Sequence, residues 1–137
     1  MIRRESNSDR VECQLQGSKA VRDALGAAHR FGEVQQLSED QLARLCIIIE
    51  ELIANLYDHG GLTEEDKVEM SLGREPDGIR IIIADPGKPF DPRSAAPRRE
   101  RPARGGGAGI DIVRSWAHFV DYSATQDGNR LELMLPI

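Results

Sequence analysis

Apolar and polar residues alternate one by one in several short stretches of the chain, which is the period of a half-buried β-strand. A Pro-Asp-Gly turn at 76–78 separates two of these stretches, and the second is mostly apolar, as expected for a mostly buried strand. Strands are predicted for residues 10–16, 67–72, 79–84, a stretch before the Asp127-Gly128 turn, and 130–135.

Three other stretches repeat their apolar residues every three or four positions, which is the period of an α-helix. The first is expected to run from an N-cap at Ser18 to about Phe31, with Gly32 ending it. The second begins at a capping box over residues 38–41 and ends at the glycine pair 60–61. The third is expected at 110–118. The resulting order of elements predicts an α+β two-layer sandwich, in which helices cover one face of a mostly antiparallel mixed sheet.

Residues 86–104 follow neither period. They hold five of the seven prolines and five arginines, among them Arg104. A loop of this length in a compact domain is typical of a lid, a binding loop or disorder, and we interpret it as a lid. The chain is then a tail at 1–9 followed by one domain at 10–137.

The long helix at 38–59 carries the first candidate chemistry. A projection at 100° per residue predicts a core-facing stripe of Leu42, Leu45, Cys46, Ile49, Ile53 and Leu56. Glu51 and Asn55 lie four residues apart on the opposite side, where Ile47, Ile48 and Ala54 flank them. An acid and an amide among apolar residues indicate the wall of a pocket. The alternative is that Glu51 belongs to an ordinary exposed face.

The composition and charge of the chain limit the classes of partner that it is expected to bind. The net charge is −5, from 18 basic and 23 acidic residues, which argues against direct binding of nucleic-acid phosphates. No apolar run approaches the roughly 18 residues of a membrane span, and no apolar stretch typical of a signal peptide follows Met1. Cys13 and Cys46 fit no metal-binding spacing. We therefore expect a cytoplasmic protein without a membrane or nucleic-acid partner.

Three short motifs occur in a fixed order along the chain. A glycine-rich stretch before a helix is a weak signal alone, because it serves equally as an anion site or as a hinge. The motifs are Glu51-x-x-x-Asn55-x-x-x-His59-Gly60, then Asp85-x-Gly87-x-Pro89-Phe90-Asp91-Pro92, then Gly105-Gly106-Gly107-Ala108-Gly109-Ile110. Together they resemble the N box and the two glycine boxes of the ATPase superfamily of gyrase, heat-shock chaperones, histidine kinases and mismatch-repair proteins. The Pro-Phe-Asp-Pro variant and the hairpin at 127–131 make the chain most similar to the anti-sigma-factor serine/threonine kinases.

This resemblance implies a Bergerat-type ATP-binding fold, with ATP and Mg²⁺ as cofactors. It implies that Asn55 ligates the Mg²⁺ and that Glu51 is the general base. Asp85 would accept a hydrogen bond from the adenine amino group, with Gly87 keeping the backbone close to the base. Gly105, Gly107 and Gly109 would present N–H groups to the phosphates. We add Arg104 as a candidate for neutralising charge at the terminal phosphate.

Three functions remain open from the sequence. The first is a kinase that phosphorylates Ser or Thr of an anti-sigma-antagonist protein and sequesters a sigma factor. The second is a nucleotide-dependent binding switch without phosphoryl transfer. The third is a detached histidine-kinase ATPase module, which the lack of a preceding phosphoacceptor helix disfavours. Whether the chain forms a homodimer stays open.

Overall fold

The strands form a single five-stranded sheet. The computed structural model describes residues 9–89 and 107–137, and its strands are β1 (Arg10–Gln16), β2 (Lys67–Glu75), β3 (Gly78–Asp85), β4 (His118–Thr125) and β5 (Gly128–Pro136). They lie in the order β1-β2-β3-β5-β4, and every pairing between them is antiparallel. The predicted α+β sandwich is confirmed, although the expected mixed sheet contains no parallel pair among the described strands.

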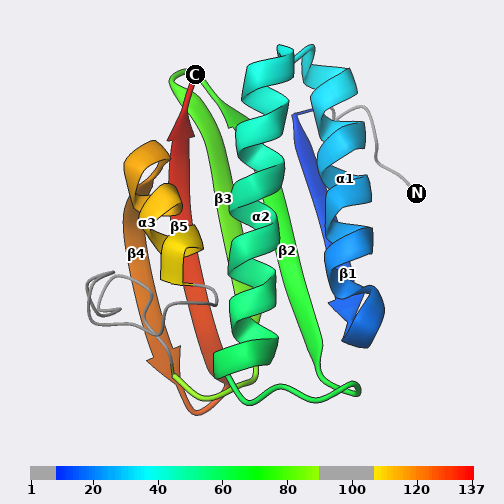
Figure 1. Cartoon of the computed structure of the whole chain (residues 1–137), viewed down its shortest axis with the longest axis vertical. Coiled ribbons are helices and arrows are strands. Elements are labelled where there is room, and N and C mark those ends of the chain that lie inside the picture. Colours follow the sequence, from blue (N-terminus) through cyan, green and yellow to red (C-terminus); the bar gives the residue numbers. More distant parts are fainter. Residues whose placement is uncertain (1–8, 90–106) are drawn as a thin grey trace.

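The helices pack together on one face of this sheet (Figure 1). They are α1 (Ala20–Gln35), α2 (Glu39–His59) and α3 (Gly107–Trp116), and a short 3₁₀ turn at Gly17–Lys19 precedes α1. The long α2 crosses the middle of the sheet between α1 and α3 (Figure 1). Alternate residues of β3, from Ile79 to Asp85, are buried beneath the helices, because successive side chains of a strand point to opposite faces.

Both predicted ends of α1 were wrong. Ser18 lies in the 3₁₀ turn and does not cap α1, whose N-cap is Lys19, without a side-chain cap bond. Gly32 lies inside the helix, which continues to Gln35 and closes with Gln36 in the left-handed region at φ 58°. A Cβ at Gly32 would come within 2.9 Å of the Leu42 side chain. Gly32 therefore permits close packing of α1 on α2 rather than ending α1.

The start of α2 was predicted correctly. The Ser38 hydroxyl accepts a hydrogen bond from the Gln41 backbone N–H at 3.1 Å, and the Gln41 side chain accepts one from the Ser38 N–H at 2.8 Å. This reciprocal pair is the capping box. At the other end, the Gly60 N–H donates to the Leu56 carbonyl, and Gly61 takes φ 75°.

The predicted core stripe of α2 was wrong in part. Its buried residues are Leu45, Ile48, Ile49, Leu52, Ile53 and Asn55. Leu42, Cys46 and Leu56 are only partly buried. Because α1 and α3 pack against opposite sides of α2, its buried face is wider than the sequence stripe. Asn55 therefore belongs to the buried face, whereas Glu51, one turn earlier, is half-buried.

Helix α3 begins and ends earlier than predicted. It starts at Gly107 rather than Ile110 and ends at Trp116, so that His118 is already the first residue of β4. Trp116 is half-buried, and the Arg44 guanidinium of α2 lies 5.2 Å from the centroid of its ring. This cation–π contact joins the C-terminal end of α3 to α2. Residues 90–106, which hold most of the predicted lid, and residues 1–8 of the predicted tail lie outside the described residues.

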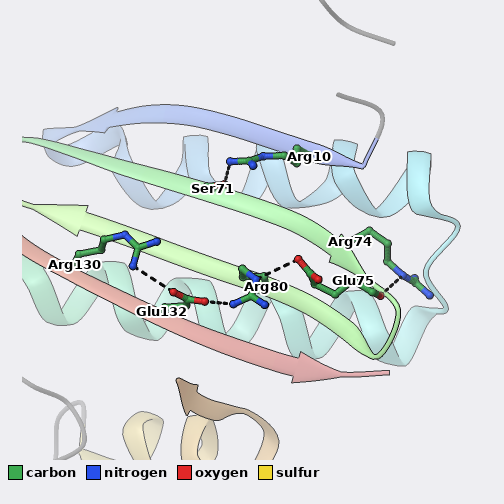
Figure 2. A network of polar contacts seen from close by, with 7 residues as sticks. All are labelled: Arg10, Ser71, Arg74, Glu75, Arg80, Arg130 and Glu132. Carbon is green, nitrogen blue, oxygen red and sulfur yellow. Dashed lines mark hydrogen bonds and ion pairs between the residues drawn. The ribbon is translucent and has the colours of Figure 1, made fainter. Parts of the chain in front are cut away.

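The other face of the sheet carries a network of charged side chains (Figure 2). Arg80 of β3 pairs with Glu132 of β5 and, at 3.2 Å, with Glu75 of β2. Arg130 completes the network with a second contact to Glu132 at 3.2 Å. Opposite charges on neighbouring strands support the pairing of β2, β3 and β5 on the face opposite the described helices. Within the described part of the chain, no helix combines the length and apolar character needed to cross a membrane.

Candidate functional site

Three buried polar side chains gather at one end of the sheet. In the described part of the chain, the buried polar or charged residues are Asn55, Asp85 and Asn129, which are 5%, 8% and 5% exposed. They come from the C-terminal half of α2, the end of β3 and the start of β5. Burial of a polar group is costly unless the group is satisfied. Their concentration at one place therefore marks the candidate site.

Asp85 is held by donors on one side of its carboxylate. Its Oδ1 accepts hydrogen bonds from the Gly87 N–H at 2.7 Å and from Asn129 Nδ2 at 3.1 Å. No described residue donates a hydrogen bond to Oδ2. The carboxylate thus has one oxygen fixed by the fold and one oxygen available to a ligand.

The chain after β3 is tied to the end of α2. The Lys88 N–H donates to the Gly60 carbonyl at 2.8 Å. A Cβ at Gly87 would lie 2.5 Å from that same carbonyl oxygen, 2.8 Å from Leu62 Cδ2 and 3.0 Å from Asp85 Oδ1. Only glycine fits at position 87 without displacing one of these groups. The tight approach brings the Asp85 carboxylate to the side of α2 that carries Asn55.

A small, mostly apolar pocket lies between α2 and the sheet. Asn55 and Asp85 supply its polar lining, and the remaining lining residues are Leu52, Leu56, Ile83, Tyr122 and Leu131. The Asn55 Nδ2 is buried and has no hydrogen-bond partner within the described residues. An apolar pocket with a few convergent polar groups is the usual form of a small-molecule site. The expected pocket wall on α2 is thus present at Asn55, whereas Glu51 is not among the lining residues.

Glu51 lies one turn before Asn55 on α2. Burial raises the pKa of its carboxyl, and the negative charges of Glu50 and Asp58 raise that pKa further. A carboxylate with a raised pKa holds a proton more readily, which suits a group that accepts one during a reaction.

The remaining predicted site residues are placed only in part. Gly107 and Gly109 lie in the first turn of α3, where backbone N–H groups have no partner within the helix. Arg104 and Gly105 lie outside the described residues. The described residues include no cluster of three or more His, Cys, Asp or Glu side chains that could hold a metal ion.

Asn129 is a site residue that the sequence did not reveal. Its Nδ2 donates to Asp85 Oδ1 and also to the carbonyls of Gly87 at 2.9 Å and Lys88 at 3.2 Å. In the sequence, the hairpin at 127–131 served only as part of the resemblance to a known family. The available signal was an asparagine directly after an Asp-Gly turn, yet its importance depends on β5 pairing with β3, where Asn129 lies opposite Asp85.

Comparisons with known proteins agree with the fold. A family model of the histidine kinase-like ATPase domain matches residues 17–135. The catalytic domain of histidine kinase ThkA, in a nucleotide-free form, is similar over 92% of this chain and 97% of its own length, with a TM-score of 0.50 and 11% identity. At that identity the likeness concerns the fold alone.

A second solved structure is less complete in its overlap. The histidine kinase domain of the Erythrobacter litoralis EL346 blue-light activated histidine kinase aligns with 88% of this chain at 14% identity and a TM-score of 0.49. The chain spans only 64% of that domain. No curated protein sequence gives a significant match.

Proposed function

Because the chain belongs to the histidine kinase-like ATPase domain family, we propose that its pocket binds the adenine of ATP. The observation that carries this proposal is the concentration of buried polar side chains, with Asn55 and Asp85 lining one apolar pocket. The apolar walls suit the faces of a purine ring, and the Asp85 carboxylate is an acceptor for an exocyclic amino group. The buried amide of Asn55, whose nitrogen has no partner among residues 9–89 and 107–137, suits a site completed by a ligand.

The proposed cofactor is Mg²⁺-ATP. Mg²⁺ prefers oxygen ligands and is commonly held by one or two protein groups together with substrate phosphates. The Asn55 side-chain oxygen is a ligand of the right kind, and the scarcity of acidic clusters among the described residues agrees with a cation held mainly by a nucleotide. When bound, Mg²⁺-ATP supplies a transferable phosphoryl group and the cation that screens its charge.

We propose further that the domain is a protein serine/threonine kinase. Its substrate would be a Ser or Thr hydroxyl of an anti-sigma-antagonist protein, and the same domain would sequester a sigma factor. Glu51 would take the proton of the attacking hydroxyl, a role that its raised pKa favours. Support for this finer assignment comes from the motif resemblance and from Glu51 lying one turn before Asn55.

A pair of adjacent glutamates provides the test. Glu50 is exposed, whereas Glu51 is half-buried one turn before Asn55, so Glu50→Gln is a matched control for Glu51→Gln. We expect Glu51→Gln to lower phosphoryl transfer to purified anti-sigma-antagonist domains by about 10²- to 10⁴-fold, the usual contribution of a general base. ATP affinity, measured by calorimetry, should remain close to that of the wild type. Asn55→Ala should weaken Mg²⁺-dependent ATP binding as well as transfer.

The outcomes separate the candidate functions. Normal Mg²⁺-ATP binding and normal transfer in both Glu51→Gln and Asn55→Ala would refute the kinase assignment. Nucleotide binding by the wild type without transfer to any acceptor would favour the nucleotide-dependent switch. Absence of ATP binding by the wild type would overturn the proposed site itself.

A further inference from the structure

One amide group connects three parts of the candidate site. Asn129 Nδ2 lies within hydrogen-bond distance of the Asp85 carboxylate, the Gly87 carbonyl and the Lys88 carbonyl, at 3.1, 2.9 and 3.2 Å. All three partners are acceptors, so the amide must present its nitrogen to them and its oxygen elsewhere. An amide nitrogen carries two hydrogens, and one of them is therefore shared between two acceptors. The orientation of Asn129 follows from this chemistry.

The backbone around Asn129 is equally constrained. Asn129 lies opposite Asp85 in the β3–β5 pairing, and the preceding Gly128 has φ 130°. A Cβ at Gly128 would lie 2.5 Å from the Asp85 carbonyl oxygen. The turn therefore packs directly against the Asp85 backbone. The β3–β5 register and the turn before β5 together place the Asn129 side chain next to the Asp85 carboxylate.

The consequence concerns the orientation of the Asp85 carboxylate. Oδ1 receives two N–H donors, from Gly87 and Asn129, and these fix the plane of the carboxylate. A carboxylate held by the Gly87 N–H alone could rotate about its Cα–Cβ and Cβ–Cγ bonds and still keep that one bond. The second donor removes this freedom. Oδ2 is then presented in one direction to whatever occupies the pocket.

We propose that Asn129 is a positioning residue for base selection: by fixing the Asp85 carboxylate, it makes the pocket prefer a purine that carries an exocyclic amino donor. The inference rests on the proposed nucleotide site and adds the residue that determines its selectivity. Adenine offers an amino group at this position, whereas hypoxanthine offers a carbonyl oxygen, which a fixed carboxylate oxygen repels. Asn129 contacts Asp85 and the backbone, and acts on the ligand through them.

The experiment compares ADP with IDP, whose bases differ at C6 (an amino group in adenine, a carbonyl oxygen in hypoxanthine) and in the N1–H that hypoxanthine carries. Affinities of both are measured by calorimetry for the wild type, Asn129→Ala and the control Gln126→Ala, which alters an exposed residue of the same turn. We expect the wild type and the control to bind ADP about tenfold or more tightly than IDP, the effect of one mispaired buried group. In Asn129→Ala this preference should fall to about twofold or less, mainly through loss of ADP affinity.

The ratio of the two affinities distinguishes positioning from a purely structural role. If Asn129 only stabilises the hairpin, Asn129→Ala weakens ADP and IDP equally and keeps the preference, which would overturn the inference. Where Asn129→Ala does not fold, Asn129→Ser decides the question, because its shorter side chain cannot span all three acceptors; an unchanged preference there is equally contrary. A wild type that binds neither nucleotide removes the proposed function, and the inference with it. A wild type that binds both nucleotides equally removes only the inference.

Discussion

The close backbone approach at Gly87 allows a quantitative prediction for Gly87→Ala. The added methyl group would lie 2.5 Å from the Gly60 carbonyl oxygen, 2.8 Å from Leu62 Cδ2 and 3.0 Å from Asp85 Oδ1. The Gly60 carbonyl already accepts the Lys88 N–H, so it cannot move without stretching that 2.8 Å bond. Leu62 is flexible, but a backbone carbonyl is not. The segment after β3 must therefore shift away from α2.

The size of the effect follows from the groups displaced. Overpacking by one methyl group costs about 1–3 kcal/mol. Weakening the hydrogen bond between Lys88 and Gly60 adds about 0.5–1.5 kcal/mol. We expect the free energy of unfolding to fall by about 2–4 kcal/mol, which for a chain of this size lowers Tm by roughly 6–16 °C. Because Asp85 Oδ1 is also crowded, ADP affinity should fall about tenfold or more.

Two other glycines provide controls for the same substitution. A Cβ at Gly73 of β2 would meet only Arg10 Cγ at 3.8 Å and the Asp9 carbonyl at 4.0 Å, which is ordinary contact. A Cβ at Gly26 of α1 would meet only the flexible end of Arg30 at 3.5 Å. Gly73→Ala should therefore change stability little, and Gly26→Ala should stabilise by about 0.5–1 kcal/mol. The measurements are thermal unfolding and ADP calorimetry on all three variants. A Gly87→Ala protein with Tm within about 2 °C of the wild type and unchanged ADP affinity would refute the steric argument.

Two further predictions concern α2. Since burial raises the pKa of Glu51 above the ordinary value of 4.5, the folded state binds the proton more tightly than the unfolded state, and ionised Glu51 lowers stability as pH rises through its folded pKa. Glu51→Gln should therefore be more stable than the wild type at pH 8, and this difference should vanish below about pH 4. The free energy of unfolding is measured by chemical denaturation at both pH values. An equal difference at both would contradict ionisation of Glu51 as its cause. Ser38→Ala should lower the free energy of unfolding by about 0.5–2 kcal/mol through loss of the capping box. Ser18→Ala, at a position that does not cap α1, should change it by less than about 0.5 kcal/mol, and equal effects of the two would contradict the capping assignment.

Local sequence signals predicted the elements whose structure depends on local chemistry. The capping box at Ser38 and Gln41 satisfies its backbone groups within one turn, so the sequence alone was sufficient to place it. The alternation along β2 and the apolar run of β3 placed those strands because each has one face beneath the helices. Asn55 was found because it lies with Glu51 among apolar residues of the helix, whereas Asp85 was found through the resemblance of its motif to a glycine box.

Errors arose where packing between distant elements determines the outcome. Gly32 looked like a helix end, but its lack of a side chain accommodates Leu42 of the next helix. The predicted core stripe of α2 was too narrow because the sequence does not show that helices flank α2 on both sides. Asn129 could not be assigned because its role depends on a strand register that joins it to Asp85, 44 positions earlier in the chain.

Buried apolar side chains and buried polar side chains occupy different parts of the molecule. The face of the sheet beneath the helices is apolar over most of its length, whereas the buried polar side chains of the described residues all lie at the end where α2, β3 and β5 meet. A buried amide nitrogen without a partner among the described residues, as in Asn55, costs about 1–3 kcal/mol. A ligand that satisfies this amide and is present at about 100 times its Kd stabilises the folded state by about 2.7 kcal/mol, which is of the same size. The free-energy cost of burying polar groups and the free energy gained on ligand binding therefore involve the same few residues. This arrangement is expected of a binding site and is not needed to stabilise a fold.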